Sequence, residues 1–112
     1  MKKIEYNDFE KVEIRVGTIV EVNDFPEARV SAYKLMIDFG EMIGVKQSSS
    51  QITDYYKKEE LVGKQILAVI NFEPKQVGKF MSEVLTTGIY DEVEKVVLVS
   101  PDRLVPNGSK LL

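Results

Sequence analysis

The sequence predicts an all-β barrel that contains one short helix. Three observations carry this prediction: short segments of alternating apolar side chains, glycine or proline between them, and a single longer segment with helix signals. The alternation is clearest from Tyr33 to Phe39, where every second side chain is aromatic or aliphatic and Gly40 ends the run. A half-buried strand produces this period of two because successive side chains point to opposite faces.

The other elements follow from the same signals. Gly17 indicates a bulge or bend in the first strand, Pro26 predicts a loop before the second, and the strand that ends at Asn71 is apolar on both faces, as a buried strand is. In chain order we expect a capped helical turn over residues 7–11, strands over Ile14–Val22, Tyr33–Phe39 and Met42–Lys46, a helix from a cap at Thr53 or Asp54 to Gly63, and strands over Gln65–Asn71, Val84–Tyr90 and Val96–Val99.

A helix between the third and fourth strands of a five-stranded Greek-key barrel is the order of the OB-fold. We therefore expect a single domain over residues 1–112, with the barrel at about 14–90 and extensions at 1–13 and 91–112. The extensions carry more apolar side chains than a closed barrel needs outside it. Either they wrap the barrel or they form a subunit interface, and we favour terminal strands that build a homodimer.

Composition excludes several kinds of site. The chain has no Cys and no His, which excludes disulfides and Ser-His or Cys-His nucleophiles and leaves no basis for a zinc site. We expect no catalytic residue, no metal and no cofactor. The N-terminus has no apolar stretch behind its lysines, and no apolar run reaches the ~20 residues of a membrane span, so we expect a cytoplasmic protein without membrane insertion.

Charge points to a local binding surface. The net charge is −3, which argues against a protein that grips nucleic acid over its whole surface. Two loop-like segments, Gly44–Gln51 and Pro74–Ser82, hold three lysines and no acid, leaving 12 of the 15 basic residues against all 18 acidic residues elsewhere. These segments are the candidate site, either on one subunit or doubled by symmetry.

Each candidate side chain has a functional and a structural interpretation. The polar run from Lys46 through Gln47, Ser48 and Ser49 reads as a binding loop or as a polar connector. Asn71 reads as an amide that ties down the next loop by hydrogen bonding to its backbone, and Lys75 and Lys79 as phosphate contacts or ordinary surface lysines. Phe80 could stack on a ligand, line an apolar groove or plug the end of the barrel. A serine nucleophile would need a buried lysine as its base, and no spacing indicates one.

The segments IRVGTIVEV, FPEARVSAYKLMIDFG, IGVKQSSSQIT, LVGKQILAVINF and GKFMSEVL resemble the tRNA-binding domain appended to some aminoacyl-tRNA synthetases, and more closely its CsaA-like branch of export-related chaperones. This resemblance covers about residues 8–112 and implies an OB-fold homodimer. It places Lys46, Gln47, Ser48 and Ser49 in a binding segment, and Asn71, Lys75, Lys79, Ser82 and Glu83 along the barrel face. The synthetase-type domains carry His-Pro-x-Ala-Asp where this chain has Phe25 to Arg29, and Ser-Glu-Gly-Met where it has Ser82 to Leu85, which matches the chaperone branch.

Two functions remain. The first is a CsaA-like homodimeric chaperone for unfolded or secretory polypeptides, in which Tyr33, Phe72 and Phe80 take peptide side chains while Asn71 and the serines bond the peptide backbone. The alternative is primarily a tRNA-binding module that acts in trans in translation, through Lys46, Lys75 and Lys79 of both subunits. An enzyme is not expected.

Overall fold

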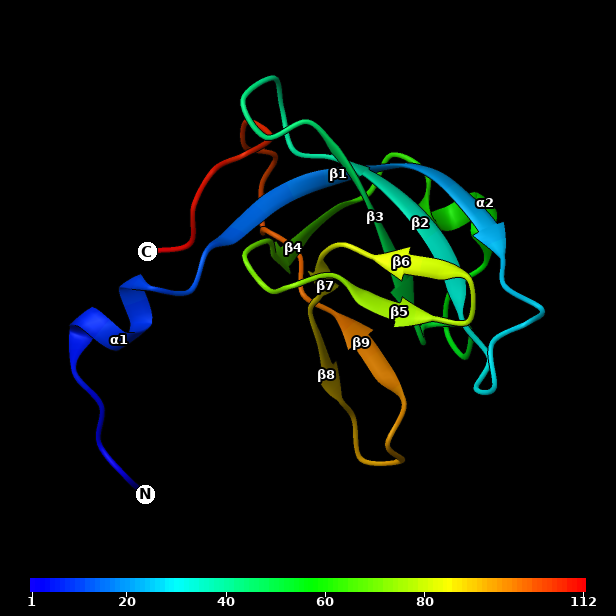
Figure 1. Ribbon diagram of the computed structural model, residues 1–112, viewed down its shortest axis with the longest axis horizontal. Coiled ribbons are helices and arrows are strands. Elements are labelled where there is room, and N and C mark those ends of the chain that lie inside the picture. The colour runs from blue at the N-terminus through cyan, green and yellow to red at the C-terminus, as the bar shows by residue number, and fades with distance from the viewer.

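A computed structural model describes all 112 residues and contains an OB-like β-barrel with two small helices (Figure 1). The predicted all-β class and the short helix between the third and fourth strands are confirmed. In chain order the elements are α1 (Tyr6–Glu10), β1 (Ile14–Asp24), β2 (Tyr33–Asp38), β3 (Val45–Ser50), α2 (Lys58–Leu61), β4 (Gln65–Val69), β5 (Lys75–Val77), β6 (Phe80–Ser82), β7 (Leu85–Thr86), β8 (Gly88–Tyr90) and β9 (Val96–Leu98).

Five strands form the barrel sheet in the order β3-β2-β1-β4-β7, and β5–β6 and β8–β9 are separate hairpins. The long strand β1 pairs with β4 through its first half and with β2 through its second half. The predicted irregularity at Gly17 is wrong, because Gly17 pairs regularly with Ile66 and the register shifts after Ile19. Gly17 is needed for close packing instead: a Cβ there would lie 2.6 Å from Cγ2 of Ile37 and 2.7 Å from Cδ1 of Phe39.

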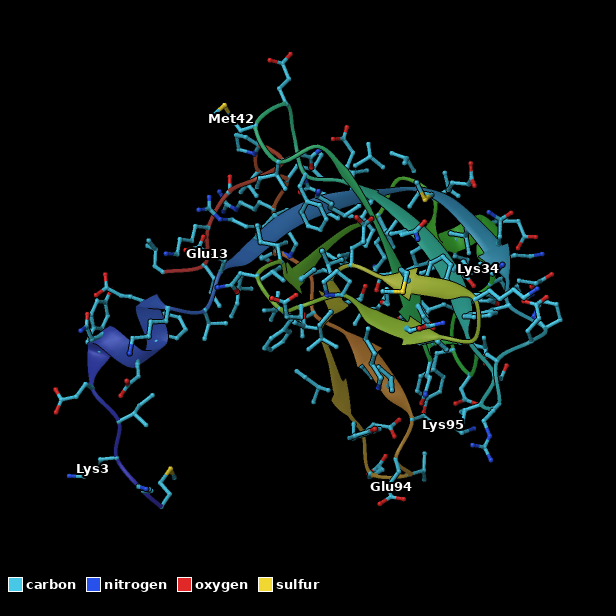
Figure 2. All side chains as sticks on the ribbon, viewed as in Figure 1. Lys3, Glu13, Lys34, Met42, Glu94 and Lys95 are labelled. Carbon is cyan, nitrogen blue, oxygen red and sulfur yellow. The ribbon has the colours of Figure 1, made fainter.

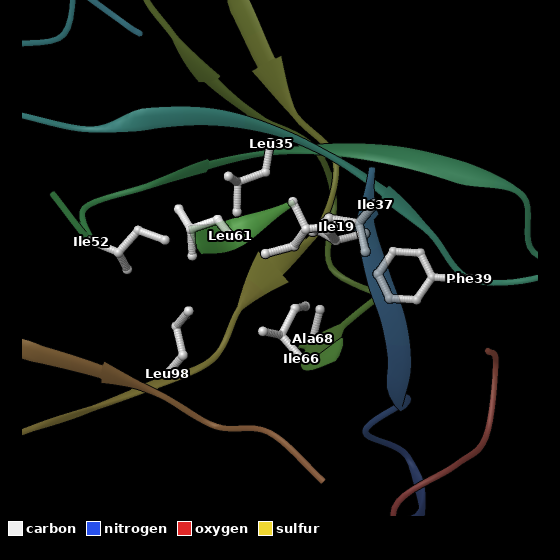
Figure 3. Close-up of a cluster of buried hydrophobic side chains, with 10 residues drawn as sticks. Ile19, Leu35, Ile37, Phe39, Ile52, Leu61, Ile66, Ala68 and Leu98 are labelled. Atoms are coloured by element: carbon white, nitrogen blue, oxygen red, sulfur yellow. The ribbon is translucent and has the colours of Figure 1, made fainter. Parts of the chain in front are cut away.

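The core lies inside the barrel and is built from the alternate residues of the strands (Figure 3). Leu35, Ile37 and Phe39 are almost fully buried, with Tyr33 partly buried against the same cluster, which confirms the predicted face of β2. Leu61 of α2 is fully buried and belongs to this cluster. Burying such side chains supplies the main free energy that holds the strands together.

Most predicted elements differ from the observed ones by one or two residues at their ends, and three differ by more or are divided. The third strand is Val45–Ser50 rather than Met42–Lys46, so the segment read as a binding loop is a strand. Only Lys58–Leu61 of the longer predicted helix is helical. The predicted strand Val84–Tyr90 is divided at Thr87 into β7 and β8. At Thr87 the N–H donates to the Leu67 carbonyl, and the carbonyl accepts from Val99 N–H.

The two ends of the chain behave differently. Residues 108–111 lie along the first half of β1: Gly108 N–H donates to the Val16 carbonyl at 2.7 Å, and Leu111 N–H to the Ile14 carbonyl at 2.9 Å. The N-terminal arm with α1 projects away from the barrel, and Lys3 lies near its far end (Figure 2). One end therefore wraps the barrel, and the other does not. The helices of this fold are too short to cross a membrane.

Candidate binding groove between two hairpins

A groove of about 1290 Å³ lies between the β5–β6 hairpin, the loop that joins β1 to β2, and β7–β8. Its walls come from residues 27–30, from Lys75–Gly78 and from 84–88, with Tyr90 and Val96 contributing from the second hairpin. Figure 1 shows the two hairpins one beside the other on the same side of the barrel. Segments far apart in the chain thus form one open depression.

The lining mixes apolar and uncharged polar residues, and its charge is slightly negative. Ten of the 24 lining residues are hydrophobic, among them Phe72, which is 57% exposed. The charged lining residues are three acids and two bases: Glu27, Glu73, Glu83, Arg29 and Lys75. An apolar depression with few charges suits an uncharged or weakly basic chain better than a row of phosphates.

The outer edge of β3 is closed by the segment that follows β6. Glu83 N–H donates to the Gln47 carbonyl at 2.9 Å, and the Glu83 carboxylate accepts from Gln47 N–H at 3.0 Å. The Ser82 hydroxyl accepts from Ser49 N–H, also at 3.0 Å. Ser82 and Glu83, two predicted site residues, therefore complete the barrel. Their side chains accept hydrogen bonds from main-chain N–H groups of β3 that a neighbouring strand would otherwise pair, and this also protects the edge of β3.

Ser48 faces inward at this seam and is fully buried. Its hydroxyl donates to the Val84 carbonyl at 3.1 Å and accepts from the Thr86 hydroxyl at 2.9 Å. Ser49 faces the other way and lines the groove, and its own hydroxyl has no hydrogen-bond partner within the protein. Ser48 and Ser49 thus point to opposite faces of β3, as the strand period requires.

Asn71 ties down the chain that enters β1. Its Oδ1 accepts from Glu13 N–H at 3.0 Å, and its Nδ2 donates to the Lys11 carbonyl at 2.7 Å. The side chain does not line the groove. The interpretation of Asn71 as an amide that binds backbone fits these contacts, although the segment it holds is the incoming one rather than the loop that follows it.

Phe80 is half-buried against Phe25, with ring centroids 5.5 Å apart, and it is not among the groove residues. The Lys34 ammonium lies over both rings, 4.9 Å from the Phe25 centroid and 5.8 Å from the Phe80 centroid. Lys34 also lies 3.9 Å from the Glu27 carboxylate. Phe80 therefore helps to cover the barrel beside the groove, and a cation already occupies its ring face.

The three candidate lysines do not share one site. Lys75 lines the groove, whereas Lys46 lies on β3 and Lys79 in the turn of the β5–β6 hairpin, and neither of these lines it. None of the three forms an ion pair within the protein. Their ammonium groups are therefore available to a ligand, but from separate surfaces. That the predicted site residues bind a ligand remains a prediction.

Sequence reasoning missed part of the groove. Arg29 and Val30 of the β1–β2 loop and Tyr90 at the end of β8 line it, and no spacing in the sequence links them to Lys75. The acid-free segments located one wall only. Tyr90 could not be found this way. It lines the groove because β8 pairs with β9 as a separate hairpin and not with the barrel sheet.

The perturbed ionisable groups lie outside the groove. Hydrogen bonds from Arg15 and Lys110 hold the pKa of Glu13 below its usual value. The Tyr55 hydroxyl donates to Asp91, which raises the pKa of Tyr55 and, with Lys95 N–H, lowers the pKa of Asp91. Both contacts tie segments of the fold together, and no group of three or more acidic side chains gathers anywhere in a metal-binding arrangement.

An OB-like barrel with an apolar groove between loops is the architecture of a binding module. Residues 14–110 match the family described as "Putative tRNA binding domain", and the chain belongs to this family. It is 34% identical over 111 residues to the methionine--tRNA ligase of Methanocaldococcus jannaschii, a match that covers 99% of this chain but 17% of that protein.

Two solved structures place the chain in the CsaA-like branch. It is 48% identical to chaperone CsaA from Bacillus anthracis, with a TM-score of 0.92 and coverage of 99% of this chain and 100% of that one. It is 54% identical to the CsaA chaperone protein from Picrophilus torridus, with a TM-score of 0.91 and coverage of 98% and 100%. The resemblance to CsaA-like members of the tRNA-binding domain family is therefore confirmed.

Proposed function

We propose that the chain acts as a CsaA-like chaperone: a homodimer that holds unfolded or export-bound polypeptides in its groove, as one domain over residues 1–112. Its expected location is the cytoplasm. The observation that carries the proposal is the composition of the groove, where ten of the 24 lining residues are hydrophobic, only five are charged, and acids outnumber bases. Unfolded chains expose apolar side chains, and burying these against Phe72 and Val77 is favourable at ~25 cal/mol for each Å² removed from water.

The homodimer in this proposal rests on apolar side chains that the monomer leaves uncovered. In the N-terminal arm, Ile4 is 71% exposed and Tyr6 is 69% exposed. On the projecting second hairpin, Ile89 is 62% exposed and Tyr90 is 71% exposed. A stable dimer usually buries about 1,600 Å² in total, and pairing these exposed side chains would contribute apolar area to such an interface. Sedimentation equilibrium should give twice the chain mass of 12.7 kDa. The chain mass itself at micromolar concentration would remove the dimer from the proposal.

Chaperone activity is tested by light scattering from a chemically denatured client protein diluted into buffer. The protein at a several-fold molar excess should suppress the scattering. A Phe72→Ser variant should suppress it less, because Phe72 lines the groove at 57% exposure, whereas Val62→Ser is the matched control at 53% exposure outside it. No suppression by the unmodified protein would end the proposal, and equal loss in both variants would separate the activity from the groove.

A second candidate is tRNA binding, which the family match over residues 14–110 favours. Lys46, Lys75 and Lys79 are free of internal ion pairs, so two subunits could present up to six ammonium groups to phosphates. Replacing about six counterions would make the affinity fall steeply with salt, with a log–log slope near −5.

A gel shift with total tRNA at low and at physiological salt tests this candidate. Changing the three lysines together to glutamine should flatten the salt dependence, whereas the same change at Lys57, Lys64 and Lys95 should leave it unchanged. The absence of a complex at both salt concentrations would eliminate tRNA binding. Adding an unfolded peptide to the complex then asks whether both ligands compete for one surface.

A further inference from the structure

The strand β5 has an unpaired edge. It pairs with β6 on one side, and no strand pairs with it on the other. All of its residues, Lys75 to Val77, line the groove together with Gly78, whereas only Ser82 of β6 does. The open side of β5 therefore faces the groove.

The register shows which main-chain groups are free on that side. Val77 pairs with Phe80 across the two-residue turn, where Gly78 has a φ of 61°. Residues that flank a two-residue turn exchange both hydrogen bonds, and antiparallel ladders alternate, so Gln76 and Met81 form a non-hydrogen-bonded pair. The Gln76 N–H and carbonyl point away from β6, and neither takes part in any main-chain bond outside the ladder.

Apart from Ser49, whose hydroxyl is free, the polar side chains predicted to bind a peptide backbone are already engaged or buried. Ser82 and Glu83 bond the edge of β3, Ser48 is buried at the seam, and Asn71 holds the chain before β1. An extended peptide must satisfy its own N–H and carbonyl groups when it enters an apolar groove, since each unsatisfied group costs about 1–3 kcal/mol. The Gln76 main chain offers both a donor and an acceptor for this purpose.

The charges of the groove define the chemistry of the segment. Of its three acids, Glu27 lies against Lys34, whereas Glu73 has no ion pair. Together with Glu83 these carboxylates outnumber Arg29 and Lys75 by one, so the groove slightly favours a basic side chain over an acidic one.

We propose that β5 binds polypeptide by strand addition: an extended, apolar segment that carries a basic residue and no acid pairs with the edge at Gln76. This inference rests on the proposed chaperone function and specifies how the groove would hold its client. In strand addition, hydrogen bonds form to main-chain groups that every polypeptide has, while alternate side chains enter the groove. This mode of binding therefore permits clients of many sequences.

The test is amide hydrogen exchange by NMR on the full-length ¹⁵N-labelled protein. The probe is an acetylated and amidated peptide of about six residues, the usual length of a strand, with apolar residues and one lysine. Saturating peptide should slow exchange at Gln76 by about tenfold or more, whereas Val77, already bonded to β6, should change little. A peptide with glutamate in place of lysine should bind about two- to fivefold more weakly.

A pair of variants separates main-chain from side-chain effects. Gln76→Pro removes the outward N–H, at an edge position where proline leaves the β6 ladder intact, and should weaken peptide binding about five- to tenfold. Gln76→Ala keeps the N–H, loses the side-chain bond to the Gly78 carbonyl, and should bind like the unmodified protein. If the proline variant fails to fold, the exchange measurement on the unmodified protein still decides.

The outcomes are distinct. Peptide binding without protection of Gln76 would overturn strand addition and leave the chaperone proposal standing. No peptide binding together with no suppression of aggregation would overturn both. If the Gln76 amide is protected without peptide and this protection is lost when the protein is diluted, the edge pairs with a second copy of the chain. If RNA protects the Gln76 amide and peptide does not, the edge binds nucleic acid. Either result would overturn the inference.

Discussion

The contribution of Ser48 to the barrel can be isolated by comparison with its neighbour Ser49. Both are serines of β3, and both follow Lys46 in an acid-free segment, but only Ser48 is fully buried. Its hydroxyl links β3 to the carbonyl of Val84 at 3.1 Å and to the hydroxyl of Thr86 at 2.9 Å. The comparison therefore changes one hydroxyl at the seam and one in the groove.

The magnitude follows from these bonds. An intramolecular hydrogen bond contributes about 1 kcal/mol net, and a buried group left without its partner costs about 1–3 kcal/mol. Ser82 also donates to the Val84 carbonyl, at 3.3 Å, which reduces the loss there. Ser48→Ala should therefore lower the free energy of unfolding by about 1–2 kcal/mol, and the melting temperature by about 4–8 °C. Ser49→Ala should change the free energy by less than about 0.5 kcal/mol.

Urea unfolding monitored by far-UV circular dichroism is the appropriate assay because the chain has no tryptophan. The midpoint should fall for Ser48→Ala while the slope stays constant, which marks a change in stability rather than in compactness. In a double-mutant cycle, Thr86→Val should cost less in the Ser48→Ala background than alone, since the two hydroxyls bond each other. Equal midpoints for the two serine variants, or additive costs in the cycle, would refute this account of the seam.

Three further predictions concern the chain before β1 and the packing of β1 itself. Asn71→Ala loses two hydrogen bonds to the incoming backbone and should lower stability by about 1–2 kcal/mol, with faster amide exchange at Glu13 than in an Asn71→Asp variant, whose carboxylate can still accept that bond. Gly17→Ala places a Cβ 2.6 Å from a core methyl group and should cost about 1–3 kcal/mol in urea unfolding; an unchanged midpoint would contradict the close packing. The pKa of Glu13 is lowered by Arg15 and Lys110, so its stabilisation is present above the unfolded-state value near 4.5 and is lost as the pH falls through the lowered folded-state pKa. Glu13→Gln should therefore show a shallower loss of stability below about pH 4.5 than the unmodified protein, and identical acid limbs would contradict the prediction.

The fold was largely readable from local pattern. The alternation of β2 depends on the side-chain period of a strand, and the barrel confirmed which of its faces is buried. Local pattern failed at β3, because serines have weak strand preference and resemble a polar loop. It failed again at Gly17, where a glycine that suggested a bulge serves the close approach of Phe39.

The candidate site was readable only in part. Absence of acids correctly drew attention to the segment that contains β5, and Lys75 does line the groove. The same signal could not tell a side chain that is free to bind from one that completes the barrel. Asn71 and Glu83 carry polar groups of the kind that binding sites use, yet both are engaged with the protein's own backbone.

What the sequence alone determined is the class of fold, the family and the chemistry available, since apolar period, residue order and the lack of His and Cys are properties of the chain itself. What only the tertiary structure decided is which polar groups remain unsatisfied. Ser48 and Ser49 are the same residue type one position apart, and the path of Val84 and Thr86 past one of them buries it. The edge at Gln76 is likewise open only because no other strand lies against β5. Hydrogen bonds that join distant segments decide such outcomes, and no local window of sequence contains both partners.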